Sequence, residues 1–393
     1  MEKVRIKNFT EVITGGTPST SKSEFWENGN IPWLNSGELN QKNVTSSRNY
    51  ITKLGLEKSS SRLMPKDTVL IALTGSTTGV VGYLTFEACA NQSVTGILPS
   101  ENHNSKYLYY YLNSIRPKVL SDAYGGAQPH ISQGYVKELE IPLPNLATQQ
   151  KIATILDQAD AIIQNNRAIV QKYDALTQSL FLDMFGDPVK NEKGWEVVQV
   201  ENVASNEKHS IKAGPFGSSL KKEFYVEKGY KIYGQEQVIK DDMSYGDYYI
   251  DEKKYKELES CRVKEGDILI SLVGTYGKVS IIPNNFEEGI INPRLMKISP
   301  NKDIIRPDFL KFLLQSSHVE KQLKNHSRGG TMDIINVGII RKVFISLPPL
   351  DIQNQFAERV AVIEAQKQQA QLALAKSEEL FASLLQRAFK GGV

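Results

Sequence analysis

The chain has 393 residues and a net charge of +3, with 40% hydrophobic and 23% charged residues. This length predicts two or three domains of roughly 150 residues, and the composition is typical of a folded, soluble protein. Residues 1–10 lack the apolar core of a signal peptide, and no window approaches the ~20 apolar residues of a membrane span. We therefore expect a cytoplasmic protein without a membrane partner.

Metal binding and disulfide bonding are not expected from the sequence. Cys89 and Cys261 are far apart in the chain, and the five histidines are scattered. Neither residue type follows the short Cys or His spacings of a structural zinc site or the dense cysteine pattern of a disulfide-linked fold.

The first globular domain is predicted over residues 1–145. Residues 68–73 form a short apolar run before a glycine, which is typical of a buried strand, and residues 106–114 have Leu and aromatic residues on helical faces. Gly75, Gly79 and Gly82 are expected in tight turns. These patterns predict an α/β or α+β fold and leave the strand order open.

A long helix is predicted in the next segment, residues 146–187. Residues 149–185 contain neither Gly nor Pro, Pro144 precedes them and Gly186 follows them. Proline does no harm just before a helix, and glycine commonly ends one. At ~1.5 Å per residue this helix would span about 55 Å, so it is too long for one small domain.

The same order of elements returns in the second half of the chain. A second globular domain is predicted over residues 188–348, with a buried strand at 267–273 and a helix at 308–315. A second long helix is predicted over residues 349–393, because residues 351–390 again lack Gly and Pro.

An internal repeat accounts for this order. Ile141–Gln150 matches Ile345–Asn354. Further parallels pair Asp67–Gly75 with Asp267–Gly274, Val4–Asn8 with Val198–Asn202, and Asn91 with Asn292. Repetition on this scale predicts two copies of one unit, each a domain followed by a helix.

Both long helices have a narrow apolar seam whose spacing alternates between four and three residues, which predicts a coiled coil. In the first helix the seam comprises Ile152, Leu156, Ala159, Ile163, Asn166, Val170, Tyr173, Thr177, Leu180 and Met184. In the second it comprises Phe356, Val360, Ile363, Lys367, Ala370, Leu374, Ser377, Phe381, Leu384 and Ala388. The alternative is that each helix lies on its own domain.

The direction of helix pairing decides the architecture. Antiparallel packing would place the domains at opposite ends of a rod with pseudo-two-fold symmetry, whereas parallel packing would crowd both at one end. The connection through a whole domain permits the antiparallel arrangement easily, so we expect it. Asn166, Thr177 and Lys367 either set the register of the seam or face solvent.

Motifs for catalysis are missing from the sequence. Pro348-Pro349 lacks the flanking residues of a methyltransferase motif, and Gly274–Lys278 has the wrong spacing for a phosphate-binding loop. Pro307-Asp308 is not followed by the acidic residue and Lys of a nuclease motif. We therefore expect a non-catalytic chain that holds no cofactor or metal of its own.

Glycine-rich polar loops are the candidate DNA contacts, because amide, hydroxyl and cationic side chains read base edges and phosphates, and glycine lets the backbone approach closely. In the first domain the candidates are Thr17, Ser19, Asn35, Ser36, Ser76, Thr77, Gln128 and His130. In the second they are Ser218, Lys221, Lys222, Gln235, Thr275, Tyr276, Lys278, Arg328 and Thr331. Each loop is equally compatible with a simple turn. The two copies differ most in these loops. One scaffold that reads two different DNA sequences would show this difference, and random sequence drift would produce a similar one.

Several motifs together carry a family resemblance. Leu143-Pro144 followed by Gln149-Gln150 opens the first long helix, and Met184–Asp187 (MFGD) and Asn191–Trp195 (NEKGW) follow it. Gly15–Ser19 (GGTPS) and a late Gly-Gly-x-x-x-Ile element add to them. With these motifs the whole chain resembles the specificity subunit of type I restriction-modification enzymes, HsdS. It departs from the pattern at Ala213–Gly217 (AGPFG), which stands where the second domain would repeat GGTPS.

The resemblance implies two target-recognition domains that each read one half of a bipartite target in double-stranded DNA. The paired helices would set the spacer and dock two methyltransferase subunits, and two restriction/translocase subunits would complete the complex. S-adenosylmethionine, ATP and magnesium would then bind to those partners and not to this chain. A stand-alone DNA-recognition part of a nuclease and a coiled-coil protein scaffold are the alternatives.

Overall fold

The structure is a computed structural model that describes residues 3–126, 128–272, 277–326 and 336–390. Its contacts divide the chain into two units. Unit 1 comprises Met1–Ile169 and Ala370–Val393, and unit 2 comprises Val170–Gln369. None of the described helices is both long and apolar enough to cross a membrane. The domain limits proposed at residues 145, 187 and 348 stay a prediction.

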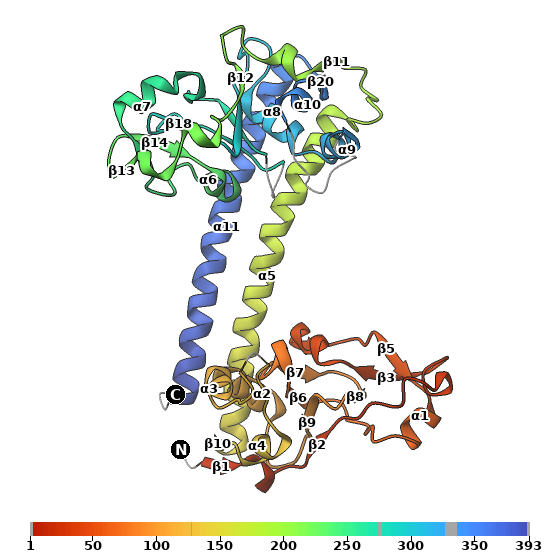
Figure 1. Cartoon of the computed structure of the whole chain (residues 1–393). Helices are drawn as coiled ribbons and strands as arrows, with labels where there is room; N and C mark the ends of the chain where they lie inside the picture. The colour runs from red at the N-terminus through yellow and green to blue at the C-terminus, as the bar shows by residue number, and fades with distance from the viewer. Residues whose placement is uncertain (1–2, 127, 273–276, 327–335, 391–393) are drawn as a thin grey trace. The chain divides into compact units, whose positions relative to one another are not determined.

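The two long helices, α5 (Leu146–Phe185) and α11 (Leu350–Lys390), each contribute to both units (Figure 1). In unit 1, Asn166 Nδ2 of α5 donates to Ser377 Oγ of α11 at 3.3 Å. In unit 2, Lys367 Nζ is 2.6 Å from Asp174 Oδ1, and the Phe181 and Phe356 ring centroids are 5.9 Å apart. Residue numbers rise along α5 as they fall along α11, so the predicted antiparallel pairing is confirmed.

The seam is confirmed as well, because every residue assigned to it is buried or half-buried. Asn166 lies in the seam and bonds across it. Lys367 also bonds across the helix pair, and its hydrogen bond to Asp174 raises the Lys367 pKa above its ordinary value. Thr177 is 9% exposed and donates to the Tyr173 carbonyl of its own helix. The polar seam residues therefore have partners in the protein and do not simply face solvent.

Unit 1 is built around two sheets. One has the strand order β2 (Val12–Thr14), β9 (Val94–Ile97), β6 (Val69–Ala72), β7 (Val81–Leu84) and β4 (Asn43–Val44). The other has the order β5 (Asn49–Ile51), β3 (Ile31–Leu34) and β8 (Cys89–Ala90), with β3 and β8 parallel. β1 (Lys3–Arg5) pairs separately with β10 (Glu140–Pro142).

Unit 2 repeats this plan, which confirms the predicted duplication. One sheet has the order β12 (Ile211–Ala213), β19 (Leu295–Ile298), β16 (Ile268–Ser271) and β17 (Val279–Ile281). The other has the order β13 (Tyr225–Val226), β15 (Tyr249–Ile250), β14 (Tyr230–Tyr233) and β18 (Gly289–Ile291), with β14 and β18 parallel. β11 (Glu196–Gln199) pairs with β20 (Phe344–Leu347) as β1 pairs with β10.

Short helices cover these sheets. In unit 1 they are α1 (Lys53–Glu57), α2 (Ser105–Ser114), α3 (Arg116–Ser121) and α4 (Gln133–Glu138). In unit 2 they are α6 (Gln235–Lys240), α7 (Glu252–Glu257), α8 (Pro307–Leu314), α9 (Ser317–His326) and α10 (Val337–Arg341). α2 and α8 agree with the helices predicted at 106–114 and 308–315. Both bury apolar or aromatic faces in the cores of their units.

The Leu-Pro-x-x-x-x-Gln motif holds the start of each long helix against its domain. The Gln149 side chain is 1% exposed, donates to the Pro144 carbonyl at 2.7 Å and accepts from the Asn104 backbone at 2.8 Å. Gln353 repeats these bonds with the Pro348 carbonyl at 2.8 Å and the Arg306 backbone at 2.9 Å. Because a buried amide must be satisfied, Gln is needed at both positions for structural reasons.

The ends of the long helices complete the cores of the units. In unit 2, Phe181 and Phe185 of α5 are buried with Phe309 and Phe356. In unit 1, Ala388 of α11 is buried, and the Phe381 and Phe389 rings lie beside tyrosines of α2. Thus α5 begins in unit 1 and ends in the core of unit 2, and α11 begins in unit 2 and ends in the core of unit 1.

The turn predictions are confirmed at two glycines and wrong at a third. Gly75 and Gly79 have φ angles of +74° and +73°, which favour glycine. Gly82 lies within β7, opposite Leu70 of β6. A Cβ there would come within 3.1 Å of the Leu39 and Val44 side chains. This glycine therefore makes room for the packing above the sheet and does not form a turn.

Candidate nucleic-acid interface

Polar loops of unit 1 meet where strands of both sheets end. Thr14 of β2 and Ala72 of β6 lie opposite Thr95 and Val94 of β9, and β3 and β8 end side by side. The Asn91 backbone N–H donates to the Leu34 carbonyl at 2.9 Å, which joins the ends of these two strands. We call the loop residues gathered here the polar edge of unit 1; they are residues 15–19, 35–37, 74–78, 91–93 and 128–130.

Glycines bring the loop after β2 close to its neighbours. A Cβ on Gly15 would collide with the carbonyls of Ala90 and Asn91, and one on Gly16 would collide with Ser60. The Gly16 carbonyl accepts from Trp33 Nε1 at 2.9 Å and from Ser61 Oγ at 2.7 Å. The Gly-Gly pair therefore serves close backbone packing, and this packing positions Thr17, whose hydroxyl donates to Gln92 Oε1.

The loop after β6 lies against the segment that precedes α4. The Gly75 backbone N–H and the Thr78 hydroxyl both donate to the Pro129 carbonyl, at 3.0 and 2.6 Å. The backbones of Tyr124 and His130 exchange two hydrogen bonds, and their rings meet edge to face with centroids 5.0 Å apart. These bonds bring Ser76 and Thr77 together with His130, although more than 50 residues separate them in the sequence.

The structure thus gathers most of the predicted contact residues of the first domain on one edge. Asn35, Ser76 and Gln128 are exposed there, and Thr17, Ser36, Thr77 and His130 are half-buried. Ser19 is exposed at the end of this edge, where its hydroxyl shares a 2.8 Å hydrogen bond with that of Ser21. Contact of these residues with DNA stays a prediction.

Unit 2 builds the same edge with the same backbone hydrogen bonds. The Asn292 backbone N–H donates to the Tyr233 carbonyl at 2.8 Å, as Asn91 does to Leu34. The Leu272 N–H donates to the Arg294 carbonyl at 3.0 Å, as Leu73 does to Ser93 at 2.7 Å. A Cβ on Gly214 would collide with the Asn292 carbonyl, as one on Gly15 would with that of Asn91. We call residues 214–219, 234–235, 278 and 292–294 the polar edge of unit 2.

The predicted contact residues of unit 2 are only partly gathered. Ser218 and Lys278 are exposed at this edge, and Gln235 Nε2 donates to Ser271 Oγ at 2.7 Å. Lys221 and Lys222 lie farther along the chain, where Lys221 Nζ is 3.6 Å from Glu223 Oε1. Thr275, Tyr276, Arg328 and Thr331 lie outside the described residues.

Sequence reasoning missed some residues on these edges. Phe216 follows Gly214 and is 87% exposed, and it takes the place that Thr17 has in unit 1. Arg294 is exposed two residues after Asn292, where unit 1 has Ser93. The sequence match between Asn91 and Asn292 could have pointed to Arg294, because the residues that follow a matched pair occupy equivalent loops.

Metal ligands do not gather in the described part of the chain. Within residues 3–126, 128–272, 277–326 and 336–390, no group of three or more His, Cys, Asp or Glu side chains is placed to hold an ion. The chemistry that these edges offer is hydrogen bonding, positive charge and one exposed aromatic ring.

Comparison with known proteins identifies the family. The family model of the type I restriction modification DNA specificity domain matches residues 1–172 and 192–373. The chain belongs to this family. The two matched stretches make it a double-copy member of the specificity-domain family, in agreement with the two units and the internal repeat.

One curated relative resembles the chain along most of its length, and another resembles part of it. The type I restriction enzyme MjaIX specificity subunit of Methanocaldococcus jannaschii is 27% identical over 397 residues, which cover 93% of this chain and 88% of that protein. The EcoR124I/EcoR124II specificity subunit of Escherichia coli is 35% identical over 153 residues, 38% of each chain. Both relatives are named as specificity subunits.

A solved structure shares the fold of this specificity-domain protein. The S subunit of a type I restriction-modification system from M. genitalium aligns with a TM-score of 0.57 over 99% of this chain and 96% of its own. Its sequence identity is 17%, so the match supports the architecture and not the identity of contact residues.

Proposed function

We propose that this chain is the DNA specificity subunit of a type I restriction-modification complex, in which each polar edge reads one half of a two-part target. The observation that carries the proposal is that one edge is built twice with the same backbone bonds and different side chains. Thr17, Gln92 and Ser93 in unit 1 stand where Phe216, Pro293 and Arg294 stand in unit 2.

This arrangement suits sequence readout. Phosphate contacts position a protein on the duplex, whereas side chains at base edges select the sequence. A loop whose backbone is held by strand ends keeps its geometry when its side chains change. Two such edges in one chain gain affinity from each other, because binding of the first raises the effective concentration of the second.

Partner subunits supply the chemistry in this proposal. Two methyltransferase subunits and two restriction/translocase subunits carry methyl transfer, ATP hydrolysis and cleavage, together with S-adenosylmethionine, ATP and magnesium. Family membership supports this division. In unit 1, Ile162 and Ile169 lie seven residues apart on α5 and are 49% and 41% exposed. Such an apolar stripe is suited to the docking of a partner helix.

Domain exchange tests the reading of half-sites. Residues 1–140 are replaced by those of a related specificity subunit, and methylated bases are mapped in cells that contain the complete complex. We expect one half of the methylated target to change and the other to remain. The reciprocal exchange of residues 188–348 is the control and should change the other half. A change in both halves after either exchange would contradict the modular reading.

A gel-shift assay tests DNA recognition itself. The full chain is mixed with genomic DNA fragments, with and without its methyltransferase subunits. Sequence-selective binding under either condition supports a specificity subunit. Absence of selective binding under both conditions would favour a protein scaffold, and cleavage by the chain alone would favour a nuclease.

A further inference from the structure

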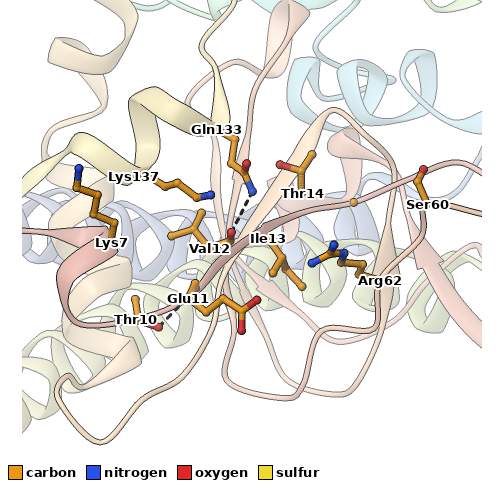
Figure 2. Close-up of a pocket in the computed structure, with 11 residues that line it drawn as sticks. Lys7, Thr10, Glu11, Val12, Ile13, Thr14, Ser60, Arg62, Gln133 and Lys137 are labelled. Atoms are coloured by element: carbon orange, nitrogen blue, oxygen red, sulfur yellow. Dashed lines mark hydrogen bonds between the residues drawn. The ribbon is translucent and has the colours of Figure 1, made fainter.

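A positively charged groove runs along the edge strand β2 of unit 1 (Figure 2). Its volume is about 720 Å³, and it reaches from Lys7 and Thr10 to Gly15 and Ser60. Gln133 of α4 lies in its wall and donates to the Val12 carbonyl at 2.9 Å. The groove therefore ends at Gly15, where the polar edge of unit 1 begins.

Three cationic side chains from separate parts of the chain line this groove. Lys7 precedes β2, Arg62 precedes β6 and Lys137 lies on α4. Lys7 pairs with Glu138 at 2.5 Å. In the part of the chain that the structure describes, neither Arg62 nor Lys137 forms an ion pair with a carboxylate. Glu11 also lines the groove, so the positive charge exceeds the negative charge.

The second copy of the repeat keeps only one of these three positive charges. The Ile6 N–H donates to the Leu139 carbonyl, and the Val200 N–H donates to that of Val343, so Glu201 stands where unit 1 has Lys7. The first turns of α4 and α10 are capped by Ser132 and Asn336, so Arg341 stands in place of Lys137.

The counterpart of Arg62 is uncharged. The Met64 N–H donates to the Ala88 carbonyl, and the Val263 N–H donates to that of Gly289 in the same part of the repeat. Two residues earlier, unit 1 has Arg62 and unit 2 has Cys261, which is 2% exposed.

Of the three cations that line the groove of unit 1, unit 2 keeps one, and that cation has partners of its own. The Arg341 guanidinium is 4.0 Å from the Glu201 carboxylate and donates to the Ile211 carbonyl at 3.3 Å. Arg341 is thus occupied with β12, whereas Arg62 and Lys137 face an open groove. The excess of positive charge here is a property of unit 1 that its own duplicate does not share.

We propose that this groove binds the phosphodiester backbone of DNA beside the half-site that unit 1 reads. This inference rests on the proposed function, because it assumes that the polar edge faces DNA. A second groove, of about 470 Å³, lies across the Gly15–Ser19 loop and is lined by Lys22 and Lys58. Ser60 lines both grooves. Cations therefore line both grooves beside this loop, and Glu24 also lines the second. A cation there can neutralise a phosphate next to the recognition loop.

The inference makes DNA binding unequal between the units. Each phosphate neutralised by a cation releases condensed counterions, and the logarithm of affinity then falls with the logarithm of salt concentration by about 0.9 per contact. Arg62 and Lys137 would together contribute about two to this slope. Neither selects a base, so their loss should weaken binding to all sequences alike.

The test measures the salt dependence of DNA binding by the full chain with the double substitution Arg62→Gln and Lys137→Gln. Fluorescence anisotropy follows a labelled duplex of mixed sequence at a series of KCl concentrations. The slope should be smaller by about two in the double variant and by about one in each single variant. The target sequence mapped by methylation should not change.

Two controls separate charge from structure. The charge-preserving variant Arg62→Lys with Lys137→Arg should keep the wild-type slope, and Arg341→Gln in unit 2 should leave it unchanged. Thermal melts establish that each variant is folded. An unchanged slope in a folded double variant would overturn the proposal that the groove binds DNA. An equal decrease of the slope in Arg341→Gln would overturn it as well. If the wild-type chain and its complex bind no DNA, it is the proposed function that fails.

Discussion

The ring of Phe181, near the end of α5, stacks on the ring of Phe312 in α8 with their centroids 4.6 Å apart. Phe181 is 3% exposed and also lies beside Phe185 and Phe356. These contacts join the end of the first long helix to α8 and to the start of the second long helix within the core of unit 2. The helix end is therefore part of a domain core and not only part of a coiled coil.

Replacing Phe181 by Ala should destabilise unit 2 by about 3–5 kcal/mol, the usual cost of removing a large side chain from a packed core. Hydrogen exchange measured by mass spectrometry would show faster exchange in peptides of α8 and β16. Leu176→Ala is the control on the same helix, because Leu176 is 48% exposed and should have a much smaller effect. Equal effects of the two substitutions would contradict the role given to the helix end.

Removing one heptad from both long helices should shorten the spacer of the DNA target. Deletion of residues 167–173 from α5 and 369–375 from α11 keeps the seam spacing, and it retains Asn166 with Ser377 and Asp174 with Lys367. Seven residues correspond to about 10 Å of helix, or about three base pairs. Methylome mapping measures the spacer. Deletion from α5 alone would misalign the seam and should abolish assembly. An unchanged spacer in a double deletion that still assembles would contradict the idea that the paired helices set the spacer.

His103 should make unit 1 sensitive to acid. Burial lowers the pKa of His103 to about 4, and its ring packs on Phe9 while Nδ1 shares a 2.8 Å hydrogen bond with Ser100. The unfolded chain binds a proton at the His103 imidazole more readily than the folded chain does, so protonation favours unfolding. The contribution of neutral His103 to the free energy of unfolding is therefore fully present above the unfolded pKa of about 6.5. This contribution, roughly 3 kcal/mol, is lost as the pH falls toward 4.

Urea unfolding at a series of pH values between 4 and 7 tests this expectation. His103→Gln should flatten the pH dependence in this range, whereas substitution of the exposed His209 should preserve it. The same pH dependence in wild type and His103→Gln would show that another group is responsible.

Phe216 should contribute to recognition by unit 2 alone. Its ring is exposed on a polar loop, where it can stack on a base or wedge between base steps. Phe216→Ala should weaken binding by about 1–3 kcal/mol, without a change in melting temperature. Anisotropy with duplexes altered in one half-site at a time measures which half is affected. Phe344→Ala, at a 49% exposed ring on β20, is the control, and an equal loss there would contradict a specific role.

Local pattern was sufficient for much of the architecture. The apolar run at 68–73 became β6, and the spacing of Ile152, Leu156 and Ala159 gave the seam, because both signals depend on neighbours in the sequence. Periodicity gave no hint that Phe185 and Phe389 complete domain cores. A seam residue and a core residue have the same apolar character, and only tertiary packing distinguishes them.

The polar edges were harder to predict, since long-range contacts build them. Thr17 meets Gln92, and Gly75 meets Pro129, through pairings that no local pattern specifies. Part of the family motif also proved structural, because Gln149 and Gln353 are buried and satisfied at the helix starts. Comparison of the two copies recovers what single motifs do not, and Phe216 and Arg294 emerge from it directly.

The position of Phe389 has a consequence for biosynthesis. Most of unit 1 precedes unit 2 in the sequence, yet its core includes Ala388 and packs against Phe389. Unit 2 draws on nothing beyond residue 369, so the residues that are translated after it serve unit 1. The core of unit 1 therefore cannot be completed before residue 389 has been translated, and a premature stop codon between residues 370 and 388 removes core residues from unit 1 and none from unit 2.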